Sequence, residues 1–259
     1  MSTETKKYPS NPILPVIHLQ HGSALAVSMA EKAIEAGAGG VFVIDHRPGT
    51  FKNEGILAEA VTDVITEFPE LWVGVNCLGL TAIKSIEFFG KETGVDAVWV
   101  DNALDWQSRM SVRQDHRHME EEGSALRSVK KGNAVVFGGV SMKGTGYVRD
   151  DEEASRLVAH SQKYIDVVTT SGVGTGQPIE KPRLQALRDV IYQGDKLAVA
   201  SGVDRDNLYW HLQLADYVLV GSSIETEPLS GIFDKNKLAS LMSAYLEFEL
   251  DNLAGIKKS

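Results

Sequence analysis

The amino-acid sequence predicts a single-domain α/β protein with the (β/α)8 architecture of a TIM barrel. Eight short, almost wholly apolar segments alternate with eight segments of helical periodicity. The complete unit recurs at roughly 30 residues, which is typical of such barrels. Strands of a parallel sheet are covered on both faces, so they are apolar along their length. A doubly wound open sheet also alternates strands and helices and is the main alternative, but eight complete units favour the closed barrel.

The repeat is clearest in the last third of the chain. Apolar runs at residues 166–170, 197–200 and 217–220 are each followed by a turn of small residues. Helical patterns over residues 181–192 and 205–215 separate these runs. Strand, small-residue turn and helix in this order is the βα unit of a parallel sheet.

The earlier units follow the same rule. Gly37, Pro69 and Gly94 mark the ends of the first three helices, since glycine and proline terminate helical segments. The remaining expected strands are residues 15–19, 40–45, 71–78, 96–102 and 134–142, and the remaining expected helices are residues 23–37, 54–68, 81–93, 123–131, 152–163 and 233–250.

Residues 104–122 interrupt this rhythm. The segment is rich in arginine and histidine and has no apolar stripe, so we expect a long loop after the fourth strand. Such insertions are often lids or binding loops, and whether this one closes over a ligand stays open. No linker divides the chain. We expect a polar lead-in over residues 1–12, the barrel over residues 13–251 and a tail over residues 252–259.

Composition excludes several classes of protein. The net charge of −9 argues against binding to nucleic acid or to an anionic membrane surface. No apolar run is long enough to cross a bilayer, and the N-terminal residues lack the apolar core of a secretion signal. A single cysteine, Cys77, cannot form an intramolecular disulfide and suits a reducing compartment. We therefore expect a cytoplasmic protein.

Polar residues gather where the expected strands end, which is where TIM barrels build their active sites. Several have a simpler interpretation: His18 as a buried core histidine, Asp101 as a cap, Lys143 as a solvated side chain. Asp204 is best explained as the N-cap of the helix that follows it. The candidate catalytic residues are His18, Asp45, His46, Asn76, Asp101, Asn102 and Lys143.

The small-residue turns after the sixth, seventh and eighth strands predict a phosphate site, because backbone N–H groups in such turns bind anions. The candidate phosphate-binding residues are Gly172, Gly174, Thr175, Gly176, Ser201, Gly202, Gly221, Ser222 and Ser223. The G-x-G-x-x-G spacing of a dinucleotide site is not met. His116, His118 and Glu120 match no recognised metal-ligand set, so we expect neither a metal nor a cofactor.

The motifs PVIHL, GVNCL, SGVGTG, ASGV and ADYVLVGSSI occur in this order along the chain. Together they resemble the BtpA/SgcQ family over about residues 13–247. The resemblance implies a phosphate-binding-type TIM barrel. It links some members to photosystem I biogenesis and others to sugar metabolism, with no reaction assigned to the family as a whole. This chain departs from the family pattern at residues 20–23 and at Asp45 and His46, which implies a divergent branch with a different substrate.

Two functional hypotheses remain open. The first is an enzyme acting on a phosphorylated small metabolite, such as a sugar phosphate, a phosphoribosyl compound or a nucleotide. Asp101 or Asp45 would be the general base, His18 or His46 the acid, and Lys143 would neutralise developing negative charge. Isomerase, lyase and glycosyl or phosphoribosyl transferase chemistry are all compatible with these residues.

The second hypothesis is a non-catalytic, BtpA-like protein that acts in assembly or regulation by binding a partner or ligand. Tyr209, Trp210, Leu212 and Leu214 would then contribute to a self-association surface of a homo-oligomer, although packing on the barrel explains most of them. The two hypotheses differ in one expectation. An enzyme needs the polar residues at the strand ends to converge on one cavity, and a scaffold does not.

Overall fold

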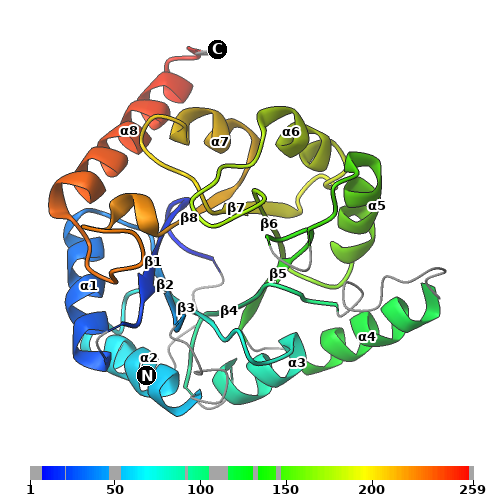
Figure 1. Cartoon of the computed structure of the whole chain (residues 1–259), viewed down its shortest axis with the longest axis horizontal. Helices are drawn as coiled ribbons and strands as arrows, with labels where there is room; N and C mark the ends of the chain where they lie inside the picture. Colours follow the sequence, from blue (N-terminus) through cyan, green and yellow to red (C-terminus); the bar gives the residue numbers. More distant parts are fainter. Residues whose placement is uncertain are drawn as a thin grey trace.

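A closed barrel of eight parallel strands forms the centre of the molecule, and helices surround it (Figure 1). The computed structural model describes residues 8–20, 22–46, 54–90, 93–104, 116–130, 134–143 and 147–256. The strands follow one another around the barrel in sequence order, and β1 pairs with β8. This closure confirms the predicted TIM barrel and excludes the open sheet.

The elements alternate as the sequence predicts. The strands are β1 (Ile13–His18), β2 (Val41–Ile44), β3 (Val73–Asn76), β4 (Ala97–Val100), β5 (Val135–Gly139), β6 (Val167–Ser171), β7 (Lys196–Ala200) and β8 (Tyr217–Val220). The helices are α1 (Ser23–Glu35), α2 (Glu54–Glu67), α3 (Ala82–Ser85) with the π-helical turn η1 (Ile86–Gly90), α4 (His116–Val129), α5 (Asp151–Ser161), α6 (Lys181–Asp189), α7 (Leu208–Leu214), the 3-10 helix η4 (Ser222–Ile224) and α8 (Lys235–Leu253).

Aromatic rings fill the inside of the barrel. Phe42 makes edge-to-face contacts with Trp72, Trp99 and Phe137, at ring-centroid distances of 5.4, 5.7 and 5.1 Å. Such pairs stabilise a core beyond the area they bury. Gly74 leaves the space that Phe42 occupies, because a Cβ at this position would lie 2.3 Å from its ring.

A second apolar layer lies between the strands and the helices. Side chains alternate between the two layers along each strand, since successive residues of a strand point to opposite faces. In β2, for example, Phe42 and Ile44 belong to the inner core, and Val41 and Val43 to the outer one. This alternation decides which residues at the strand ends can reach the barrel axis.

Three aspartates join neighbouring strands at the N-terminal end of the barrel. Each directly precedes one strand and accepts an N–H group from the first or second residue of the strand before it. Asp96 accepts from Val73, Asp166 from Val136 and Asp216 from Leu197, at N···O distances of 2.8, 2.9 and 2.9 Å. Contacts at this end of a TIM barrel serve stability, because the active site lies at the other end.

Helix α4 begins at His116, earlier than the predicted start at residue 123. The added turns contain Glu120 and Glu121, which are exposed, so they need no apolar stripe to be stable. Gly123 lies inside the helix and packs closely on Tyr164, where a Cβ would be 2.4 Å from the ring. Residues 105–115 of the predicted loop lie outside the described residues.

Helix α7 begins three residues after the predicted start. The Asp204 carboxylate accepts the N–H groups of Asp206 and Asn207 at 2.9 and 3.0 Å, so it caps the turn that leads into the helix. Leu212 and Leu214 are buried and pack on the core rather than forming a surface patch.

No helix among the described residues is long and apolar enough to span a membrane.

Replacing Asp216 with alanine should lower the free energy of unfolding by about 1–3 kcal/mol, because the N–H group of Leu197 loses its acceptor. Asp216 also contacts Arg188 Nη1 at 2.7 Å, and this ion pair would be lost as well. Urea denaturation of the purified variant measures the change. Asp189→Ala, which alters an exposed aspartate on the neighbouring helix α6, is the matched control. Equal midpoints for the two variants would contradict a stabilising role for Asp216.

Candidate active site

A cavity of about 370 Å³ opens at the C-terminal end of the barrel. Apolar side chains from the inner core, including Trp99 and Leu219, form part of its lining. Most of the candidate residues from the sequence also line it: His18, His46, Asp101, Lys143, Thr175, Gly176, Ser201, Gly202, Gly221, Ser222 and Ser223.

Strand alternation brings these side chains to the barrel axis. His18 continues the inward-pointing series of Leu14 and Val16 in β1. His46 continues the same series in β2, two residues beyond Ile44. The two imidazole rings stack with their centroids 5.1 Å apart and their planes inclined by 26°.

Asp101 lies at the end of β4 and is held by Asn76 on the neighbouring strand. The Asn76 side chain is fully buried, and its Nδ2 donates to Asp101 Oδ1 at 3.1 Å. Burial raises the pKa of Asp101, while the hydrogen bond from Asn76 and the charge of Lys143 oppose that rise. A raised pKa makes the protonated form of a carboxyl group more accessible, which suits a group that exchanges protons with a substrate.

Lys143 reaches the cavity from the loop after β5. Its Nζ donates to Ser201 Oγ at 3.2 Å, and its backbone N–H donates to Ser171 Oγ at 2.8 Å. Burial lowers the pKa of Lys143, and the negative charge of Asp101 partly restores it. The cavity therefore holds a lysine and a carboxyl group whose charges favour each other.

His46 is largely desolvated. Burial lowers its pKa to about 4, with further lowering from His18 and Lys143 and a smaller opposing effect from Asp45. Its ring is therefore neutral at pH 7. Its buried Nδ1 has no hydrogen-bond partner among the described residues. A neutral imidazole beside the cavity can accept or donate a hydrogen bond to a bound molecule.

The turns after β7 and β8 also line the cavity. Ser201 and Gly202 both have φ of 69°, a conformation that is uncommon for a serine. Gly202 lies against the loop after β6, where a Cβ would be 2.1 Å from the backbone nitrogen of Pro178. Ser223 Oγ donates to the carbonyl oxygen of Val203 at 2.6 Å, which ties the two turns together.

Five candidates do not line this cavity, and one of them is Asn76, which supports Asp101 from the neighbouring strand. Asp45 is buried and follows the outward-pointing residues of β2, and Asn102 lines a different cavity. Gly172 is packed against its own loop, since a Cβ would lie 2.3 Å from the carbonyl oxygen of Gln177, and Gly174 contacts the same residue. These two glycines allow the loop after β6 to pack closely on itself, and they do not line the cavity.

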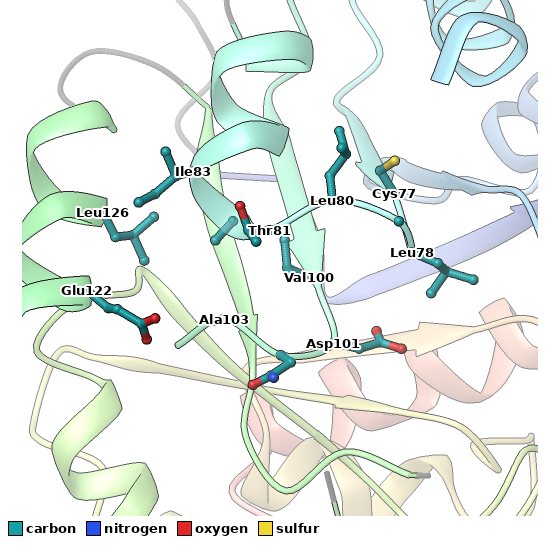
Figure 2. Close-up of a pocket in the computed structure, with 13 residues that line it drawn as sticks. Cys77, Leu78, Leu80, Thr81, Ile83, Val100, Asp101, Ala103, Glu122 and Leu126 are labelled. Atoms are coloured by element: carbon teal, nitrogen blue, oxygen red, sulfur yellow. The ribbon is translucent and has the colours of Figure 1, made fainter. Parts of the chain in front are cut away.

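The second cavity, of about 410 Å³, lies between the loop after β3 and helix α4 (Figure 2). Figure 2 shows Glu122 reaching in from α4, Ile83 and Leu126 on the apolar side, and Asp101 at the end of β4. Asp101 lines both cavities.

Among the described residues, no group of three or more histidine, cysteine or acidic side chains is placed to hold a metal ion.

One polar residue beside the cavity was not predicted from the sequence. Glu225 is fully buried, and its Oε1 lies 2.7 Å from His18 Nδ1. It follows the turn after β8 by only a few residues, and an acidic residue there is the one signal that could have drawn attention to it.

Comparisons with known proteins agree on the fold. No family model matches the chain, and no curated protein matches it significantly. A structure described as native KDPGal aligns with a TM-score of 0.65 and 11% identity, covering 94% of this chain and 98% of that one. Phosphoribosyl anthranilate isomerase from Thermotoga maritima aligns with a TM-score of 0.61 and 13% identity, covering 92% and 99%.

A third structure, (S)-3-O-geranylgeranylglyceryl phosphate synthase from Thermoplasma acidophilum, aligns with a TM-score of 0.61 and 15% identity. The alignment covers 92% of this chain and 94% of that one. At such low identity the likeness shows that the chain has the fold of these proteins.

The low pKa of His46 predicts both its titration and an effect on stability. The ring should stay neutral down to a midpoint near pH 4, because the folded protein disfavours the charged form. Since the unfolded chain binds this proton at about pH 6.5, stability should be fully present above that pH and fall toward pH 4, by no more than about 3 kcal/mol.

Histidine NMR titration measures the midpoint, and His46→Gln assigns the resonance. Between about pH 6.5 and about pH 4, His46→Gln should lose less unfolding free energy than the native protein. A His46 midpoint close to the ordinary value for histidine would contradict the desolvated environment described above.

Proposed function

We propose that this protein is an enzyme that acts on a phosphorylated small metabolite. The observation that supports this most strongly is the composition of the cavity at the C-terminal end of the barrel. The small-residue turns after β7 and β8 line it together with the side chains of Asp101, His18, His46 and Lys143. A phosphate held on the turns would leave the rest of the molecule among groups that can transfer protons.

The turns suit a phosphate for three reasons. TIM barrels frequently bind phosphate with the loops after strands 7 and 8 together with a short extra helix, and here η4 follows β8 directly. The glycines allow an anion to approach the backbone closely. Lys143, held beside Ser201, supplies a positive charge at the same wall in a protein whose net charge is −9.

Two proteins with the same fold bind phosphorylated molecules. Phosphoribosyl anthranilate isomerase has been crystallised with a reduced deoxyribulose 5-phosphate compound, and geranylgeranylglyceryl phosphate synthase with sn-glycerol-1-phosphate. The fold therefore accommodates phosphorylated compounds in these proteins. Isomerase, lyase and glycosyl or phosphoribosyl transferase chemistry are the reaction classes that we propose.

Asp101 is the residue best placed to act as the general acid or base. It lines the cavity, its pKa is raised by burial, and Asn76 fixes the orientation of its carboxyl group. Lys143 would stabilise negative charge that develops on the substrate. His18 and the neutral ring of His46 would contact the reacting part of the molecule. Asp45 lies outside the cavity and would act only indirectly.

The convergence of these side chains favours an enzyme over a non-catalytic scaffold. A scaffold has no need for a histidine pair, a carboxyl group and a lysine in one cavity at the active-site end of a barrel. Membership of the BtpA/SgcQ family, supported by the sequence motifs, is compatible with this function. A cytoplasmic location and assembly into a homo-oligomer belong to the same proposal.

Ser222→Asp should abolish the binding of phosphorylated sugars, because it places a negative charge where the phosphate lies. It is a better test than a change at Gly221, where any Cβ would lie 2.7 Å from the His18 ring. Thermal unfolding with ribose 5-phosphate, phosphoribosyl pyrophosphate and nucleotides measures the effect. A ligand at 100 times its Kd adds about 2.7 kcal/mol, a rise in Tm of roughly 2–4 °C.

Ser243→Asp is the matched control, since it adds the same charge on an exposed part of α8. It should keep the ligand-induced rise in Tm that Ser222→Asp loses. The absence of a rise with any phosphorylated compound in the native protein would contradict the proposed function.

Asp101→Asn should fold normally and lose at least about 100-fold in kcat toward the phosphorylated compound that binds, because amide groups do not exchange protons. Asp45→Asn makes the same chemical change at the end of strand β2, outside the cavity, and should lose much less. Steady-state kinetics of both variants decide between the two aspartates. Native turnover in Asp101→Asn would remove Asp101 from the mechanism.

A further inference from the structure

We propose that Glu225 is a positioning residue that orients His18 for proton transfer in the cavity. Its carboxylate would accept the Nδ1–H of the His18 imidazole and so leave Nε2 directed toward the bound molecule. This inference deepens the proposed function and rests on it for the chemistry that His18 performs. The geometry of the pair itself does not depend on the identity of the substrate.

The two residues are 207 positions apart in the chain and meet in the interior. His18 Nδ1 lies 2.7 Å from Glu225 Oε1. The exposed fraction is 5% for His18 and 0% for Glu225, so water does not compete strongly for this contact. A buried carboxylate needs a partner to compensate for lost hydration, and the imidazole provides one.

The ring of His18 has a neighbour on one face and another at its Cε1 edge. It stacks on His46, at a centroid distance of 5.1 Å. It packs against Gly221, where a Cβ would come within 2.7 Å of its Cε1 and 3.4 Å of its Nε2. Glycine at this position therefore makes room for the ring, and the contact with Glu225 fixes its rotation.

The loop between η4 and α8 depends on the same carboxylate. The N–H group of Gly231 donates to Glu225 Oε1 at 3.0 Å. Pro228 and Leu229 of this loop line the cavity. The Glu225 Oε1 atom therefore connects the imidazole of His18 to a loop that lines the same cavity. The Glu225 backbone forms an antiparallel bridge with Phe233 at the base of the loop.

Hydrogen bonding at one ring nitrogen decides what the other can do. An ionised carboxylate only accepts hydrogen bonds, so Nδ1 must carry the proton that is shared with Glu225. In the neutral ring, Nε2 then has a lone pair and can accept a proton from a bound molecule and return it later. Carboxylates that fix the tautomer of a histidine in this way are well known in enzymes that use histidine as a base.

Long-range ¹H–¹⁵N NMR of ¹⁵N-histidine-labelled protein at neutral pH tests the proposal without any substrate. We expect Nδ1 of His18 to carry a proton in the native protein. Glu225→Gln, whose amide oxygen can still accept both hydrogen bonds, should retain that state. Glu225→Leu has no acceptor and should lose it, with the proton moving to Nε2. His18→Gln identifies the relevant signals among the seven histidines.

His211 is an internal reference in the same spectra. Its Nδ1 lies 2.9 Å from the carbonyl oxygen of Asn207, which can only accept, so Nδ1 must be protonated in every variant. A His18 signal with an unprotonated Nδ1 in the native protein would overturn the proposal. So would an unchanged His18 tautomer in Glu225→Leu.

If Glu225→Leu fails to fold, the native and Glu225→Gln spectra still decide the question. Failure of this test and failure of the proposed function can be distinguished. The tautomer is read without a ligand, and phosphate binding is read from the Tm.

Discussion

The pairing of β1 with β8 is the contact on which the rest of the structure depends. It sets Ile13 opposite Val218 and Pro15 opposite Val220, and it closes a sheet that would otherwise have two edges. Closure brings the first strand end beside the last turns of the chain. His18 can therefore lie against Gly221 and Glu225, and a phosphate on the turns after β7 and β8 would lie within reach of the residues from β1, β2 and β4.

Burial sets the chemistry of the cavity. The same desolvation raises the pKa of Asp101, lowers that of Lys143 and keeps His46 neutral. Each shift disfavours the charged form, because the cavity removes these groups from water. A phosphate would interact strongly with Lys143 and the backbone of the turns, because little water remains to screen it.

The sequence predicted the barrel and most of the cavity, because apolar strands, small-residue turns and helical periods are local patterns. The sequence could not show that Asp101 rather than Asn102, and His46 rather than Asp45, lines the cavity. Both faces of these strands are apolar, so their patterns do not show which residue points inward. Only the inner core, with Trp99 and Ile44 in it, settles that alternation.

Glu225 was missed for a different reason. Its role depends on closure of the barrel, which places it beside a histidine 207 positions away, and no local pattern reports such a contact. The early start of α4 was missed because an exposed helical turn needs no apolar stripe. In both cases the deciding interaction lies outside the segment being interpreted.

The most direct test of the account is a crystal structure of the protein soaked with ribose 5-phosphate. We expect phosphate density at the C-terminal end of the barrel, within hydrogen-bonding distance of Ser201 or the backbone of residues 221–223, with the sugar directed toward Asp101 and His18. Density for the phosphate at another place on the molecule, or a cavity occupied only by water at saturating ligand, would contradict it.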